Sequence, residues 1–90
     1  MQDKEKKKKI LLYALSKTMR ELRLGKKQSQ FMFASENDIP LSIVSTAERG
    51  IKDPQFTTLF RFAEAYGMTL DKFMAKVLKN LPKDFEIIEK

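Results

Sequence analysis

Residues 29–50 read SQFMFASENDIPLSIVSTAERG, and this stretch predicts two short helices joined by a tight turn. The first helix starts at Ser29, whose hydroxyl can cap the amides that follow, and it continues to residue 35. Residues 36–38 have turn composition, because Asn and Asp tolerate left-handed backbone angles. Pro40 suits the first turn of the next helix, which runs to about Arg49 and stops at a glycine.

Three more helices are predicted around this pair, from the recurrence of apolar residues every three or four positions. They cover about residues 10–23, from Thr57 to a glycine cap at Gly67, and from a Thr69 cap to a point before Pro82. The expected fold class is all-α, a compact five-helix domain. The sequence therefore predicts one helical core over residues 10–80.

The two ends of the chain are expected to lie outside that core. Residues 1–9 are predicted to form a flexible basic arm. Residues 81–90 are a tail of ambiguous structure, since Phe85, Ile87 and Ile88 stand among acidic residues. This tail fits a short strand, a frayed helix or a segment ordered only against a second subunit.

The composition excludes several kinds of site. The 90 residues are 42% hydrophobic and 33% charged, which is typical of a folded globular domain. Because the chain has no Cys and no His, it lacks the usual ligands of zinc, haem and iron–sulfur sites, the means to form a disulfide, and the usual nucleophile and general base. We therefore expect no metal, no cofactor and no enzymatic activity.

The apolar segments are too short for a membrane or export signal. The run of six residues 10–15 is shorter than the apolar part of a signal peptide, and no stretch approaches the length of a transmembrane helix. The simplest expectation is a cytoplasmic protein.

The net charge of +6 is concentrated at the N-terminal end. Residues 1–27 hold ten of the 18 basic side chains against three acidic ones, whereas the remainder is close to neutral. Such a segment can bind a polyanion, either nucleic acid or an anionic membrane surface, or it can simply be a solvated tail. The membrane reading would place the helix from Lys6 to Arg23 on the lipid surface, but the same helix is needed in the core.

A set of residues between about 15 and 73 stands in an order and spacing typical of one family. The set is Ser29, Gln30, Ala34, Asp38, Ile39, Pro40, Ser42, Val44, Ser45, Glu48, Arg49, Gly50, Pro54, Thr58, Leu59, Ala63, Ala65, Gly67, Leu70 and Asp71. In this pattern the chain resembles the phage-repressor and Cro type of helix-turn-helix domain, the XRE or lambda repressor-like family. The resemblance implies that the second and third helices form a helix-turn-helix, whose third helix enters the major groove of DNA.

The resemblance agrees with the expected packing of the two helices. Ala34 falls where they cross, and a small side chain there lets the two backbones approach. The side chains expected on the buried side are Phe33, Ile39, Val44 and Ala47.

Carried over position by position, the resemblance also assigns the residues that contact DNA. Gln30 falls at a phosphate beside the start of the second helix, where amides also face the anion. The base-reading positions are Leu41, Ser42 and Thr46, with Ile43 at the edge of the groove, and the remaining backbone contacts fall to Arg49 and Lys52. Arg23 and Glu48 match a family ion pair that links the first helix to the third.

The reading positions depart from the family in their chemistry. They hold no Arg, Lys, Asn or Gln, so the bidentate contacts that discriminate guanine or adenine are absent. Recognition would then depend on contacts with thymine methyl groups, single hydrogen bonds and DNA shape. Alternatively, Leu41 and Ile43 form an apolar surface with Phe31 and Met32, which would suit a protein partner and make the domain a protein-interaction module.

The leading hypothesis is a transcriptional regulator that binds double-stranded DNA as a homodimer on a palindromic operator. The last helix and the tail through Ile88 are the predicted dimer surface. The lysines from Lys4 to Lys9 resemble, in composition, the basic arm that some phage repressors place around DNA. By the same resemblance the chain could be a phage repressor, a restriction-modification controller or the antitoxin of a toxin pair, and the residues do not separate these roles.

Overall fold

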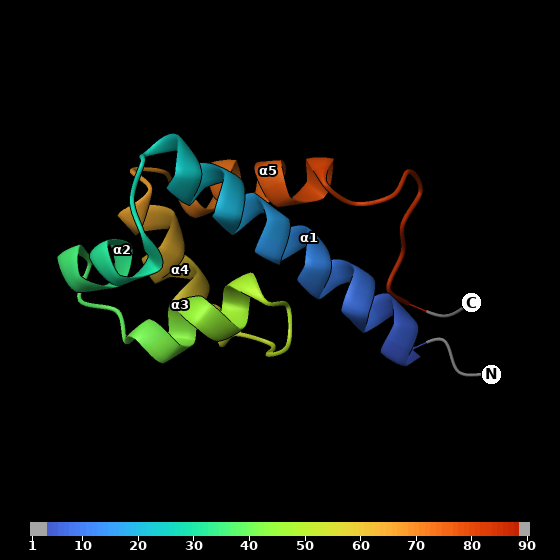
Figure 1. Cartoon of the computed structure of the whole chain (residues 1–90). Coiled ribbons are helices and arrows are strands. Elements are labelled where there is room, and N and C mark those ends of the chain that lie inside the picture. Colours follow the sequence, from blue (N-terminus) through green and yellow to red (C-terminus); the bar gives the residue numbers. More distant parts are fainter. Residues whose placement is uncertain (1–3, 89–90) are drawn as a thin grey trace.

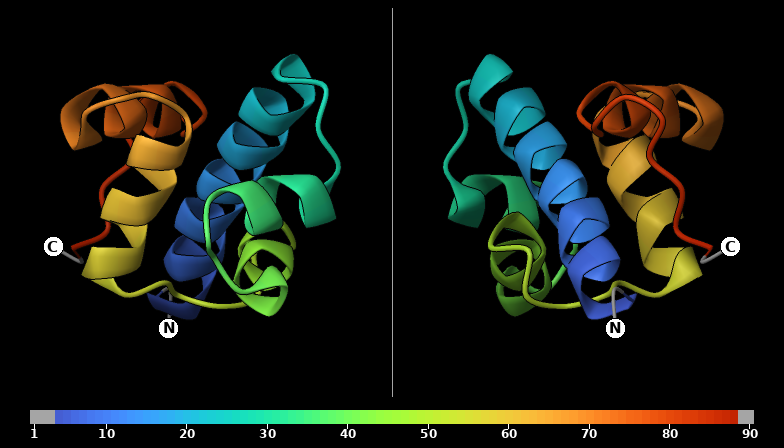
Figure 2. Two further views of the ribbon diagram at one scale, coloured as in Figure 1. Left: turned by 90° about the vertical axis from the view of Figure 1, so that its left-hand side faces the viewer. Right: turned by 90° about the vertical axis from the view of Figure 1, so that its right-hand side faces the viewer.

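The computed structural model describes residues 4–88, which form five α-helices and, within that range, no strands. The helices are α1 (Lys4–Gly25), α2 (Gln30–Glu36), α3 (Leu41–Glu48), α4 (Phe56–Ala65) and α5 (Leu70–Lys79). The long α1 crosses the molecule diagonally (Figure 1). It packs against α3 on one side and α5 on the other, while α2 packs on α3 and α4 on α5 (Figure 2). The prediction of a five-helix all-α domain is confirmed.

The first helix begins earlier than predicted. It starts at Lys4 rather than Ile10, so the described part of the expected flexible arm forms the first turns of α1. Lys and Glu are good helix formers, and Glu5 stands one turn before Lys9, a spacing that stabilises a helix. The other residues of the expected arm, 1–3, lie outside the described range.

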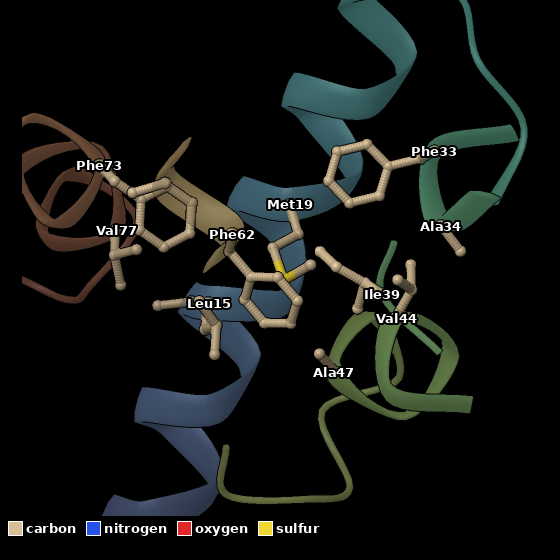
Figure 3. Close-up of a cluster of buried hydrophobic side chains, with 12 residues drawn as sticks. Leu15, Met19, Phe33, Ala34, Ile39, Val44, Ala47, Phe62, Phe73 and Val77 are labelled. Atoms are coloured by element: carbon tan, nitrogen blue, oxygen red, sulfur yellow. The ribbon is translucent and has the colours of Figure 1, made fainter. Parts of the chain in front are cut away.

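The core gathers apolar side chains from all five helices. Met19 of α1 and Phe62 of α4 lie in the middle of it, between the side chains of α3 and those of α5 (Figure 3). All the side chains predicted to be buried around the α2–α3 turn are in the core, including Ala34 at the helix crossing. The buried cluster is Ala14, Leu15, Met19, Phe33, Ala34, Ile39, Val44, Ala47, Phe62, Ala63, Phe73 and Val77.

Three aromatic rings stand in a row within this core. Tyr66, at the end of α4, stacks on Phe33 of α2 with centroids 4.6 Å apart, and on Phe73 of α5 at 6.2 Å. Its hydroxyl donates a hydrogen bond of 3.1 Å to the carbonyl of Met19 in α1. This row of rings therefore joins four helices at one place.

The helix ends follow the predicted caps in part. The Ser29 hydroxyl accepts from the amide of Met32 at 3.0 Å, and Asp38 in the predicted turn has φ of 53°. Thr69 stands at the N-cap of α5 as predicted, although its hydroxyl caps no amide there. The first helix ends at Gly25, and the left-handed residue that follows it is Lys27, with φ of 58°.

Residues 80–88 form neither helix nor strand. Asn80 donates its side-chain amide to the Thr18 hydroxyl at 2.8 Å, and Leu81 packs on the core. The chain then returns toward the first turns of α1 (Figure 1) and leaves Ile87 and Ile88 exposed. Within residues 80–88 the tail is therefore irregular, neither the strand nor the frayed helix that its sequence allowed.

Candidate nucleic-acid interface

The α2–α3 unit (residues 30–48) is closed by a turn that positions α3. The amide of Ile39 donates to the carbonyl of Ala34 at 3.0 Å, and the carbonyl of Pro40 accepts from the amides of the first turn of α3. Val44, Ala47 and Glu48 then face inward. The opposite face of α3 is directed toward solvent.

The inward carboxylate of Glu48 ties α3 to α1. Arg23 donates to both of its oxygens, from Nε at 2.8 Å and from Nη2 at 2.9 Å. Glu48 is only 2% exposed, so the pair is screened little by water. The hydrogen bond to Glu48 raises the pKa of Arg23, which keeps the guanidinium charged. The predicted ion pair is confirmed.

Two further contacts strengthen this junction. Arg20 of α1 donates to the backbone carbonyl of Glu48 at 2.6 Å, and Arg23 donates to the carbonyl of Gln28 at 2.8 Å. Because these groups come from α1, from the loop before α2 and from the end of α3, they hold α3 in a fixed orientation.

The structure gives Gln30 a partner inside the protein. Its side-chain amide donates to Oε1 of Glu48 at 3.0 Å, and the side chain is half-buried. Gln30 is thus part of the junction that orients α3. The resemblance, which predicted a phosphate contact for this residue, did not anticipate this bond.

The three predicted base-reading residues and Ile43, predicted at the groove edge, divide into two kinds. Leu41 and Ser42 are exposed at the start of α3, whereas Ile43 is half-buried and packs against the core. The hydroxyl of Thr46 donates to the carbonyl of Ser42 at 2.8 Å and is half-buried. The exposed side of α3 therefore offers methyl groups and hydroxyls, with no charged or amide side chain.

A groove runs between α3 and the connection to α4, which passes below the bundle in Figure 2. The predicted backbone contact Lys52 lies on it and is exposed, with Asp53 beside it. The groove is lined by Ser42, Ile43, Thr46, Ala47, Lys52, Asp53, Pro54, Gln55 and Thr58. It brings two of the three predicted base-reading residues, Ser42 and Thr46, together with Ile43 and one predicted phosphate-binding cation.

Arg49, the other predicted backbone contact, is exposed at the C-cap of α3 and faces a different hollow. The first turns of α1 form the opposite wall of that hollow, with the exposed side chains of Lys8 and Lys9. These two lysines were not predicted as site residues, because they were assigned to a flexible arm. The Glu5 and Lys9 spacing in a segment without Pro or Gly is the signal that would have placed them on the helix.

Apolar side chains are also exposed near the α2–α3 unit. Phe31, Met32 and Leu41 have exposed fractions of 67%, 45% and 44%. Ile43, the fourth member of the predicted apolar surface, belongs mainly to the core. The surface available to a protein partner is thus formed by the first three.

Residues 4–88 give no sign of two other kinds of site. In that range no three acidic side chains come together in a way that could hold a metal ion. None of the helices described there combines the length and the apolar character needed to cross a bilayer.

Comparisons with known proteins identify no relative of this chain. No protein-family model, no curated protein and no solved structure matches this chain.

Proposed function

We propose that the chain is a sequence-specific DNA-binding transcriptional regulator that places α3 in the major groove. One observation carries the proposal: α3 turns Leu41 and Ser42 to solvent while the buried Arg23–Glu48 pair fixes its inner side. An α-helix with its side chains is about 10–12 Å across, and the major groove is about 12 Å wide, so a helix such as α3 fits in it. The start of α3 can therefore enter the groove without any movement of the core.

The chemistry of the exposed side defines how bases would be read. Leu41 contacts thymine methyl groups, Ser42 makes single hydrogen bonds, and Thr46 does so when its hydroxyl turns from the Ser42 carbonyl. Arg49 and Lys52 bind phosphates on either side of α3. The shape of the DNA supplies the rest of the specificity. This function needs no catalytic residue and no cofactor, and it is exercised in the cytoplasm.

The regulator is proposed to act as a homodimer. One α3 covers only a few base pairs, and two copies related by a two-fold axis read half-sites about 34 Å apart. Leu78 on α5 and Ile88 in the tail are apolar and are 60% and 70% exposed, so a second copy could cover them. They are the proposed dimer surface.

Selection of a preferred duplex from random sequences, followed by measurement of its affinity, tests the proposal. We expect a palindromic site, bound by the wild type at about 50 mM salt and more weakly at about 200 mM. Ser42→Ala should change base preference at one position. Arg49→Gln and Lys52→Gln should each lower the slope of log affinity against log salt by about 0.9. The matched control is Arg61→Gln, an exposed cation on α4 that lies beside Asn37 and Glu64.

The dimer is tested separately by sedimentation of Leu78→Asp. A charge in an apolar interface is unpaired and costly, so we expect a monomer that binds single half-sites weakly. An unchanged sedimentation coefficient for Leu78→Asp would place the dimer surface elsewhere.

A protein-interaction module is the second candidate, favoured by the exposed Phe31, Met32 and Leu41. Under this reading the α2–α3 unit presents apolar side chains to a protein and not to DNA. The same binding experiment discriminates between the two functions. No shift of any duplex at about 50 mM salt would reject the DNA-binding proposal and favour a protein partner.

A further inference from the structure

The first turns of α1 carry a cationic surface close to the end of α3. Lys8 and Lys9 line one hollow together with Arg49. Residues 49–51, which form the opposite wall, carry no acidic side chain. Glu5, from the same turns of α1, is the acidic residue that lines this hollow, so cations outnumber it.

The neighbouring carboxylate of Glu48 does not oppose these cations. It points inward and is neutralised by the hydrogen-bonded guanidinium of Arg23. The hollow therefore keeps a net positive potential, which favours an anion.

This surface lies at the same end of the molecule as the groove beside α3. In both views of Figure 2 the first turns of α1, the helix α3 and the connection from α3 to α4 reach the lower end together. The connection carries Arg49 toward the hollow of α1 and Lys52 toward the groove of α3. The two hollows that hold these cations thus lie at the same end of the protein.

We propose that Lys8 and Lys9, held on the helical first turns of α1 beside Arg49, bind the phosphodiester backbone of DNA next to the groove that α3 enters. This inference rests on the proposed function and adds the first turns of α1 to the proposed DNA-binding surface. A segment that is already helical has little backbone freedom to lose when it binds, in contrast to a flexible arm. The contact should therefore occur at a fixed distance from α3 on every site.

The salt dependence of binding to the selected duplex tests the inference. Lys8→Gln/Lys9→Gln removes two cations, and Gln keeps nearly the helix propensity of Lys. The matched control is Lys76→Gln/Lys79→Gln, which removes the same charge from the exposed side of α5, and sedimentation verifies that this variant keeps the dimer proposed to form through Leu78. Because the first variant can no longer neutralise two phosphates, its slope of log affinity against log salt should fall by about 1.8. The affinity decrease between about 50 mM and about 200 mM salt then becomes about 12-fold smaller, and the control should keep the wild-type slope.

A second readout uses the wild-type protein. Acetylation of lysines followed by mass spectrometry should show Lys8 and Lys9 protected by the duplex, and Lys76 and Lys79 unprotected. Circular dichroism of the variants verifies that α1 is intact.

The outcomes separate the two proposals. If the wild type binds the duplex while both double variants share its slope and Lys8 and Lys9 react freely, the contact by α1 is rejected and the function of α3 stands. If the wild type binds no duplex, both proposals are overturned.

Discussion

Glu48 is a charged residue in a place that usually holds an apolar one. It is 2% exposed, and its carboxylate accepts from Arg23 and Gln30 at 2.8 to 3.0 Å. A buried charge is tolerated only when its partners replace the lost water. The geometry of α3 therefore depends on a small number of polar contacts, and these can be removed one at a time.

Glu48→Ala should lower the free energy of unfolding by about 3 kcal/mol, because it leaves the guanidinium of Arg23 without its partner. The side chain of Arg23 is 12% exposed, so some water can reach it and the loss should stay at the low end of the usual range. Urea denaturation measures the change. Glu64→Ala, at an exposed position of α4, is the control and should change stability by less than about 0.5 kcal/mol. A loss below about 1 kcal/mol for Glu48→Ala would show that the pair does not hold α3.

At the scale of the element, the end of α1 stores strain that a substitution can release. Lys27 adopts a left-handed backbone, with φ of 58°, although it has a side chain. Gly25, in contrast, is the last residue of the helix, and a Cβ built there meets no atom within 4 Å. The helix thus has its glycine at position 25, whereas the left-handed backbone that favours glycine is at position 27.

Lys27→Gly should raise stability by about 1 kcal/mol, since it removes the left-handed strain of an L-residue. Gly25→Ala should raise it by up to about 1 kcal/mol, because alanine favours the helix. For a domain of this size each change corresponds to a rise in Tm of about 4 to 8 °C, measured by thermal unfolding. Gly67→Ala provides the opposite case, because Gly67 has φ of 71° and should lose stability. Equal Tm values for all three variants would contradict this account.

The sequence predicted the middle of each helix better than its ends. Apolar spacing located the five helices and the buried Phe33 and Val44, because burial imposes the helical period. The start of α1 was misplaced, because Lys8 and Lys9 lie outside the apolar pattern and only propensity and charge spacing place them in a helix. The apolar pattern alone therefore does not determine where such a helix begins.

The candidate site was predictable to the same limited extent. The resemblance predicted the Arg23–Glu48 pair, which the structure confirms. It did not predict that Gln30 joins this pair, because a bond between residues 18 positions apart depends on how α2 and α3 pack. The hollow that Lys8 and Lys9 share with Arg49 was missed for the same reason.

At the scale of the whole molecule, Tyr66 links pH to stability. Burial raises the pKa of its phenol, and the nearby charge of Glu48 raises it further, while Arg23 lowers it. The folded state therefore keeps Tyr66 neutral at a pH where the unfolded chain, with a tyrosine pKa of about 10, ionises. The stability that this contributes is fully present below about pH 10 and is lost as the pH rises above it.

The wild type should therefore lose more free energy of unfolding than Tyr66→Phe between about pH 9 and about pH 11, with a slope of up to about 1.4 kcal/mol per pH unit above pH 10. Urea unfolding of both proteins at each pH measures the difference. At neutral pH the free energy of unfolding of Tyr66→Phe should be about 1 kcal/mol lower than that of the wild type, because the hydrogen bond to the Met19 carbonyl is lost. Parallel pH profiles for the two proteins would reject the linkage.

The row of rings also provides an intrinsic spectroscopic signal of the fold. The chain has two tyrosines and no tryptophan, and Tyr13 is exposed while Tyr66 is stacked between Phe33 and Phe73. A near-ultraviolet circular dichroism signal requires fixed packing around an aromatic ring, so the tyrosine band should come mainly from Tyr66. That band reports, without any label, whether α2, α4 and α5 still meet when a duplex or a protein partner is added.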